Sequence, residues 1–304
     1  MFKKILILST LILVFSQAFY SYEEPPKTLL ERKEVQKRNE KIKEAKIKMT
    51  ISYKYNIADG KETDLKFKII EQEFNQAGQL TYLSTFFVNG IKDKYEYKYD
   101  KNSNRVEEKI YDGAGNVVKR NEFIYDDEGK ILGVKSYGKK GELLESVTYY
   151  YDNGKRLITE KRYKEGKILF LTTDYEYGND YDLFYPLLIE RFDDQNHLVS
   201  KTENQIGSNG KVVESITYDK DGKRISRVQY EHDSNGNVTK KSDYDKDNSL
   251  TSYELYSYSK EGVLSEIRVF NSSKKLTTLI KNEFEYFDKR NEKAKGGKEA
   301  GVTG

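Results

Sequence analysis

Aromatic and aliphatic residues recur along this chain in one short phrase. Each copy begins with an aromatic residue, continues with Asp or a small polar residue and then Gly or Asn, and has an aliphatic residue six positions after the aromatic. The clear copies run from Tyr111 to Val117, Tyr125 to Ile131, Tyr137 to Leu143, Tyr151 to Leu157, Phe192 to Leu198 and Tyr258 to Leu264, and looser copies begin at Phe74, Tyr163, Tyr218, Tyr244 and Phe270. Such self-similarity indicates a repeat protein.

The copies are regularly spaced. The aromatics Tyr99, Tyr111, Tyr125, Tyr137, Tyr151, Tyr163 and Tyr177 follow one another in steps that alternate between 12 and 14 residues. The same alternation returns from Tyr218 through His232, Tyr244 and Tyr258 to Phe270. Two phrases therefore make one unit of 26 residues.

Each phrase has the composition of a tight turn between two strands. Asp and Asn side chains hydrogen-bond to the backbone two residues on, and Gly or Asn adopts the positive φ of a chain reversal. The intervening segments, such as residues 143–151 and 225–231, are seven to nine residues long and rich in Tyr, Val, Ile and Thr. We therefore predict an all-β fold over residues 49–288, a repetitive antiparallel β-meander of two-strand units. Whether its sheet is single-layered, a sandwich or a spiral stays open.

The pattern also predicts which residues share a face. An even spacing of six places the aromatic and the aliphatic residue of a phrase on one face, as a ladder of Tyr and Leu across neighbouring strands. Lys, Glu, Thr and Ser are then expected on the opposite face. Pro is excluded from central strands, so Pro186 and the Tyr-rich residues before it (175–186) predict a longer loop or a break between two sub-arrays.

The composition favours such a fold without a large dry core. Of the 304 residues, 36% are hydrophobic and 34% charged, and the aromatics include 26 Tyr and 14 Phe. In a repeat protein each unit is stabilised mainly by its neighbours, so low hydrophobicity is compatible with a folded state. The chain has no Cys, which excludes disulfides, thiolate metal sites and cysteine nucleophiles.

Residues 1–18 have the pattern of a secretory signal peptide. Lys3 and Lys4 precede an apolar run over residues 5–15, and Ser16 and Ala18 are the small residues of a cleavage site. The run is shorter than the roughly 20 residues of a spanning helix, with a retained membrane anchor as the alternative. We expect an exported protein, periplasmic, cell-surface or secreted, that is not an integral membrane protein after cleavage.

Basic segments flank the repeats. Residues 27–48 contain nine Lys or Arg and four Glu, without Gly or Pro, which predicts a short helix after Pro26. Its apolar residues are irregularly spaced, so we expect a charged helix or linker over 19–48 that is mostly solvated. Contact with the acidic body, anionic lipid or a cell-wall polymer is the alternative. Residues 289–304 predict a disordered basic tail.

The phrase Tyr125-Asp126-Asp127-Glu128-Gly129-Lys130-Ile131 resembles the YD repeats of Rhs-type and teneurin-type proteins. The stretch from Tyr151-Asp152-Asn153-Gly154 to Tyr163-Lys164-Glu165-Gly166 is also similar to the MORN-like variant repeats of exported bacterial proteins. The likeness covers about residues 70–288. It implies a β-hairpin repeat of the kind that serves shells, adhesins and scaffolds.

The chain offers few groups for catalysis. Its two histidines, His197 and His232, fall in turn phrases, and acidic pairs such as Asp126-Asp127 and Asp193-Asp194 recur because turns recur. No nucleophile elbow, Walker loop or dinucleotide motif is present. We therefore assign no catalytic, cofactor-binding or metal-binding residues, and we expect neither enzyme activity nor a cofactor.

One segment partly matches a calcium loop. Asp243, Asp245, Asp247 and Glu254 occupy ligand positions one, three, five and twelve, with Leu250 at eight and Asn248 in place of the glycine at six. Tyr244-Asp245 is also an ordinary repeat phrase. An ordinary turn is the favoured interpretation, and calcium binding between Asp243 and Glu254 is the alternative.

These observations favour a non-enzymatic exported repeat protein that presents a β surface to a protein or glycan of the cell envelope or extracellular surface. Nucleic acid is not expected as a partner, because the positive charge lies in the flanks and the repeat body is acidic. The first alternative is an envelope component that self-associates through unpaired terminal strands. The second is an envelope-polymer hydrolase, which predicts a cleft lined by carboxylates.

Overall fold

The computed structural model describes residues 26–27, 29–87, 90–153, 156–178 and 185–287. The predicted signal peptide (1–18) and the predicted tail (289–304) lie outside the described residues. Within them one helix, α2 (Leu29–Glu44), precedes eighteen strands. This confirms the predicted short helix ahead of an all-β body.

The strands follow one another with tight connections. The first nine are β1 (Ile47–Ala58), β2 (Lys61–Phe74), β3 (Leu80–Phe87), β4 (Gly90–Tyr99), β5 (Arg105–Asp112), β6 (Val117–Tyr125), β7 (Ile131–Gly138), β8 (Leu143–Tyr151) and β9 (Leu157–Lys164). The other nine are β10 (Ile168–Glu176), β11 (Leu188–Phe192), β12 (Leu198–Ile206), β13 (Val212–Asp219), β14 (Arg224–His232), β15 (Val238–Tyr244), β16 (Leu250–Tyr258), β17 (Leu264–Asn271) and β18 (Leu276–Tyr286).

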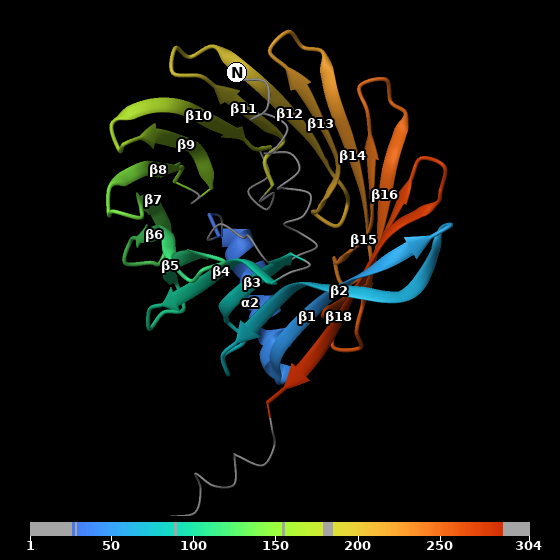
Figure 1. Cartoon of the computed structure of the whole chain (residues 1–304). Coiled ribbons are helices and arrows are strands. Elements are labelled where there is room, and N and C mark those ends of the chain that lie inside the picture. The colour runs from blue at the N-terminus through green and yellow to red at the C-terminus, as the bar shows by residue number, and fades with distance from the viewer. Residues whose placement is uncertain (1–25, 28, 88–89, 154–155, 179–184, 288–304) are drawn as a thin grey trace, which may run out of the picture.

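The described strands form one closed antiparallel sheet. Every strand pairs with the next along the chain, and β1 pairs with both β2 and β18. Figure 1 shows the strands following one another around a ring. The predicted meander is confirmed. The sequence left open whether the sheet is single-layered, a sandwich or a spiral, and the structure shows that it closes into a barrel. Since the terminal strands pair with each other, the free edges assumed for self-association do not exist in the described sheet.

Pro186 lies in the longest connection, between β10 and β11. The prediction of a longer loop there is confirmed, because β10 ends at Glu176 and β11 starts at Leu188. The prediction of two sub-arrays is wrong, because β10 and β11 remain paired across the loop, from Thr172 opposite Phe192 to Glu176 opposite Leu188.

The turns form as their residues predict. In the hairpin between β5 and β6, the Asp112 carboxylate accepts hydrogen bonds from the backbone N–H groups of Ala114 (3.0 Å) and Asn116 (2.9 Å). Gly115 has φ +83°, a conformation that residues with a side chain rarely adopt. Tyr111 then lies directly opposite Val117, so the aromatic and the aliphatic residue of the phrase are cross-strand partners.

A β-bulge follows each of these turns and changes the face on which the next phrase lies. After Tyr111 pairs with Val117, Ile110 pairs with Lys119, which leaves Val118 as the extra residue. The inserted residue reverses the alternation of side chains along the strand. One ladder on a single face is therefore wrong: successive phrases place their Tyr and Leu residues alternately on the inner and the outer face.

The inner face carries two apolar clusters. The larger one includes Ile42 of α2 with Tyr97 of β4, Tyr256 of β16 and Leu264 of β17. The smaller one consists of Phe123, Ile131, Val147, Tyr149 and Leu157. The core is thus divided into two parts, in keeping with the low hydrophobic content.

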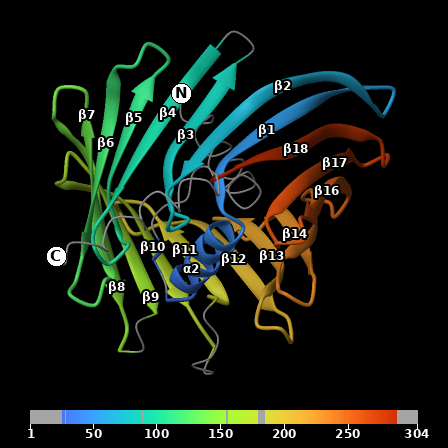
Figure 2. The same ribbon diagram turned by 90° about the horizontal axis from the view of Figure 1, so that it is seen from below.

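Helix α2 lies within the outline of the ring in both views (Figures 1 and 2). Its basic side chains donate to backbone carbonyl oxygens of three turns: Arg32 to Glu128 (3.3 Å), Lys37 to Asn235 (3.2 Å) and Lys41 to Gly262 (3.1 Å). These turns all lie at one end of the barrel, which we call the helix end; the opposite end is the far end. Most described side chains of α2 stay exposed or half-buried, in line with the expectation of a mostly solvated segment, and the alternative of contact with the body is also right.

The helix fits closely because its partners are small or polar. A Cβ on Gly78, in the turn between β2 and β3, would lie 2.0 Å from the backbone carbonyl oxygen of Asn39. Just before the helix, the Lys27 ammonium group forms an ion pair with Glu160 of β9 (2.8 Å). Ile42 is only 2% exposed. The sequence did not predict how this helix attaches to the barrel. The helix is held by one buried isoleucine and several basic side chains, whereas the usual signal is a regular apolar stripe.

Candidate functional site

The tyrosines that end the strands at the far end point to the outer wall of the barrel. Side chains alternate along a strand, so Glu96 on β4 faces outward beside the inward Tyr97. Tyr111 of β5 shares the face of Glu96, and its hydroxyl donates a hydrogen bond to the Glu96 carboxylate (2.6 Å). The outer wall, rather than the inner face, therefore carries the polar groups of these repeat phrases.

The same contact recurs at a fixed sequence distance. Four outer tyrosines bond the residue 15 positions before them, on the preceding strand: Tyr111 and Glu96, Tyr137 and Glu122, Tyr218 and Glu203, and Tyr244 and Gln229. A basic residue completes two of these units, where the guanidinium groups of Arg120 and Arg227 lie 4.7 Å and 4.9 Å from the ring centroids of Tyr137 and Tyr244. The outer wall is thus a series of tyrosine–polar–base units.

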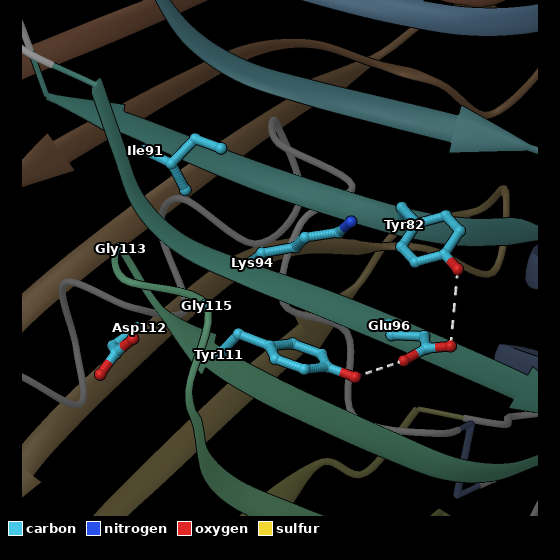
Figure 3. A pocket seen from close by; sticks show the side chains of 8 residues that line it. All are labelled: Tyr82, Ile91, Lys94, Glu96, Tyr111, Asp112, Gly113 and Gly115. Atoms are coloured by element: carbon cyan, nitrogen blue, oxygen red, sulfur yellow. Dashed lines mark hydrogen bonds between the residues drawn. The ribbon is translucent and has the colours of Figure 1, made fainter.

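One unit forms a hollow of about 370 Å³ on the wall across β3, β4 and β5. Figure 3 shows the hydroxyls of Tyr82 and Tyr111 directed at the Glu96 carboxylate from two sides. The Lys94 ammonium group lies 4.4 Å from the centroid of the Tyr82 ring. Ile91 and the glycine-containing turn after Asp112 form the rest of the lining. A cavity of this size fits a small polar ligand or one unit of a polymer.

The charges in this hollow keep its phenols protonated. The hydrogen bond to Glu96 raises the pKa of Tyr111 to about 12. The negative charge of Glu96 also raises the pKa of Tyr82 above its ordinary value. Both tyrosines are therefore neutral at physiological pH, and each offers a hydroxyl and an aromatic ring to a ligand.

A second hollow, of about 320 Å³, lies on the wall across β12 to β15. The Tyr244 hydroxyl donates to Gln229 Oε1 (3.0 Å), and Gln229 Nε2 donates to Glu214 Oε2 (2.9 Å). Arg227 Nε also donates to Glu214 (2.6 Å). Tyr244, Gln229 and Glu214 stand on successive strands, as Tyr111, Glu96 and Tyr82 do in the first hollow. Both hollows therefore derive from the same positions of the repeat.

The calcium-loop residues do not converge on one point. Asp243 and Glu254 lie near the buried Lys241 ammonium group, at 2.9 Å and 3.7 Å. Asp245 instead accepts backbone hydrogen bonds within its own turn (2.9 Å each), and Asp247 pairs with Lys246 (2.8 Å). Among the described residues, no group of three or more His, Cys, Asp and Glu is placed to hold a metal ion.

His197 lies in a turn, as predicted, whereas His232 is a strand residue that pairs with Val238. His197 lies exposed between β11 and β12, with Nδ1 3.4 Å from the Asp193 carboxylate. His232 ends β14 beside α2, where burial lowers its pKa. In each acidic pair only the first carboxylate caps the turn. Asp126 and Asp193 accept backbone hydrogen bonds there, whereas Asp127 and Asp194 do not.

Comparison with known proteins finds only remote likenesses to solved structures. No protein-family model matches the chain, and no curated protein matches it. Similar solved structures include porin-like proteins from Bacteroides uniformis (TM-score 0.42, 11% identity, 79% of this chain and 98% of that chain) and Bacteroides vulgatus (TM-score 0.38, 10% identity, 79% and 98%). The Photorhabdus luminescens Tc holotoxin pore matches with a TM-score of 0.29 and 11% identity, over 71% of this chain and 13% of that chain.

At these TM-scores the likenesses carry no argument about function. The resemblance to YD and MORN-like repeats stays a prediction, whereas the β-hairpin meander itself is confirmed. Within the part of the chain that the structure describes, no helix is long and apolar enough to cross a membrane.

Sequence reasoning missed both hollows, although a signal for them exists. A Glu or Gln precedes Tyr111, Tyr137, Tyr218 and Tyr244 by 15 residues in each case. This spacing gains meaning only once the strand register is known, because it joins two strands across one turn and one bulge.

Proposed function

We propose that this protein is a non-enzymatic, exported binding protein whose outer wall holds a repeating glycan of the cell envelope. The observation that carries the proposal is the pair of hollows built from equivalent repeat positions. A surface with periodic sites complements a polymer with periodic units, and simultaneous occupation of linked sites strengthens binding beyond that of either site.

The chemistry of the hollows suits a polyhydroxylated ligand. Tyr82 and Tyr111 provide aromatic rings that pack against the apolar faces of sugar rings, at a low cost in side-chain entropy. Glu96, Gln229 and Glu214 provide oxygen acceptors for sugar hydroxyls. The remaining lone pairs of these oxygens stay available beside their existing hydrogen bonds.

The same groups favour binding over hydrolysis. Glu96 accepts from two phenols, and Glu214 accepts from Arg227 and Gln229. The other acid of the first hollow, Asp112, caps its own turn. Carboxylates held in this way are acceptors rather than a proton donor and nucleophile placed across a scissile bond.

The outer wall is suited to water rather than lipid. Ion pairs lie along it, among them Lys98 with Glu107 (2.8 Å), Lys201 with Glu203 (2.8 Å) and Lys240 with Glu231 (2.7 Å). A lipid-facing barrel wall carries an apolar band instead. A water-exposed wall, together with the predicted signal peptide, supports the proposal of an exported protein that is not embedded in a membrane.

Co-sedimentation with insoluble polymers tests the proposal. Purified protein is mixed separately with peptidoglycan, with a neutral glucan and with an acidic polysaccharide. We expect retention on at least one polymer and about a tenfold loss of affinity on Tyr111→Ala or Tyr244→Ala. Tyr137→Ala is the matched control, because Tyr137 occupies the same repeat position but lines neither hollow. Failure of the folded wild type to bind any of the three polymers would refute the glycan.

A further inference from the structure

Because the hairpins at the helix end are equivalent, the residues at one outer position can be compared from hairpin to hairpin. In each hairpin at this end, two outward residues lie side by side: the next-to-last residue of the first strand and the bulge residue of the second. Most of these pairs contain at least one polar residue or a lysine: Glu73 with Thr81, Lys98 with Val106, Gln205 with Val213, Glu231 with Thr239 and Ser257 with Ser265. A polar or charged side chain is therefore the usual occupant of this exposed position.

Two adjacent hairpins depart from this standard. Ile124 with Leu132, on β6 and β7, and Tyr150 with Ile158, on β8 and β9, are apolar or aromatic at both positions. All four side chains remain 38% to 43% exposed, at 41%, 39%, 43% and 38%. These four residues form what we call the β6–β9 patch.

The strands within the patch make it continuous and flat. Gly133 of β7 pairs with Ile124 on one side and with Thr148 of β8 on the other. Glycine contributes no side chain there, and a Cβ would lie 2.6 Å from the Val147 carbonyl oxygen. The two apolar pairs are thus joined by a low, small-residue centre at Gly133 and Thr148, which lets a second surface approach closely.

Opposite charges border the patch along the strand direction. Toward the middle of the wall lie Lys135 and Lys161, and neither is in an ion pair with a carboxylate of another described residue; the Lys161 ammonium group lies 5.5 Å from the centroid of the Tyr150 ring. Toward the end of the barrel lies the turn with the exposed Asp127. An apolar centre with bases on one side and an acid on the other is complementary to itself under a two-fold rotation.

We propose that the β6–β9 patch is a self-association surface, on which a second copy of this chain docks antiparallel about a two-fold axis between Leu132 and Tyr150. The apolar pairs of one copy pack on those of the other. Asp127 of each copy then faces Lys161 of its mate. Self-association therefore uses a face of the barrel rather than the strand edges, which are closed.

This surface leaves the proposed glycan sites free. The hollows lie on β3 to β5 and on β12 to β15, outside the four strands of the patch. A dimer would present both sets of hollows to the same polymer and increase avidity. The dimer does not depend on that ligand, so either proposal can fail without the other.

Sedimentation equilibrium of the purified protein, without any glycan, tests the proposal. We expect a reversible monomer–dimer equilibrium that Leu132→Lys with Ile158→Lys weakens by more than tenfold. Thr239→Lys, at the equivalent bulge position of β15, is the matched control and should leave association unchanged. Circular dichroism and the melting temperature establish that each variant is folded.

Charge exchange tests the two-fold geometry specifically. Lys161→Glu and Asp127→Lys should each weaken the dimer, and the double variant should restore it, because each changed charge again meets its opposite across the interface. A wild type that stays monomeric at every concentration, or a double variant no tighter than the single ones, would overturn the proposal.

Discussion

The Tyr151 hydroxyl donates a hydrogen bond to the backbone carbonyl oxygen of Ile131, at 2.7 Å. The bond joins the last residue of β8 to the first residue of β7, on the inner face at the helix end. Three other hairpins contain the same bond: Tyr99 with Leu80 (2.8 Å), Tyr125 with Arg105 (2.8 Å) and Tyr258 with Val238 (2.8 Å). In these four units an inward tyrosine therefore ties neighbouring strands together by a bond outside the sheet ladder.

Removing this hydroxyl should cost stability at each of these positions. Burial raises the pKa of Tyr151 well above its usual range, so the phenol is a donor at any physiological pH. Tyr151→Phe leaves a buried carbonyl without this partner and should lower the free energy of unfolding by about 1 kcal/mol. Urea denaturation measures the change. Tyr150→Phe, whose side chain points outward, is the control and should change stability by less than about 0.5 kcal/mol.

Helix α2 should contribute to the stability of the whole barrel. Ile42 belongs to a cluster with Tyr97 of β4, Tyr256 of β16 and Leu264 of β17, so Ile42→Ala removes a contact that several strands share. We expect a loss of about 2 to 4 kcal/mol in the free energy of unfolding. Gln36→Ala, at an exposed position of the helix, should have little effect. Equal stabilities of the two variants would show that the helix is not part of the cooperative unit.

The Lys241 cluster should make stability depend on pH. Burial raises the pKa of the Glu254 carboxyl above its ordinary value of 4.5. The folded state thus binds this proton more tightly than the unfolded chain, so this group's contribution to stability falls as pH rises from 4.5 through the folded pKa. Glu254→Gln should remove that decline in thermal melts across this window. Asp127→Asn should retain it.

Calcium should have no effect on the protein. Asp243 and Glu254 lie beside the Lys241 ammonium group, while Asp245 and Asp247 serve the turn and a neighbouring lysine. Bringing these oxygens around one ion would require breaking the ion pairs and the turn. Isothermal titration with Ca²⁺ should show no heat of binding and no rise in melting temperature. A stoichiometric heat signal would contradict this prediction and show that the segment binds calcium.

The sequence predicted the fold well because each turn is locally encoded. Asp112 and Gly115 determine where the chain reverses, and Tyr111 determines the first cross-strand pair, all within seven residues. The ladder on one face was wrong for a related reason. A bulge residue such as Val118 has no compositional mark, so counting even and odd positions through it gives the wrong face for the next phrase.

The site and the closure were less accessible from the sequence. Contact between Tyr244 and Gln229 depends on a register that only the paired strands define, and the pairing of β1 with β18 joins residues more than 200 positions apart. Nothing in the local phrase states how many units complete a ring. The attachment of α2 to the barrel was hidden because its contacts use basic side chains and turn carbonyls, which resemble a solvated segment in composition.

Closure of the ring is the claim on which the inner and outer faces, the hollows and the patch all depend. Ser52 of β1 and Asn282 of β18 are cross-strand partners at the seam, with Ser52 Oγ 2.7 Å from Asn282 Oδ1. In a chain without other cysteines, Ser52→Cys with Asn282→Cys should form an intramolecular disulfide under mild oxidation, because directly opposed residues satisfy its geometry. Mass spectrometry after proteolysis should find the two seam peptides joined. Free thiols in the folded, oxidised protein would show that the terminal strands do not meet.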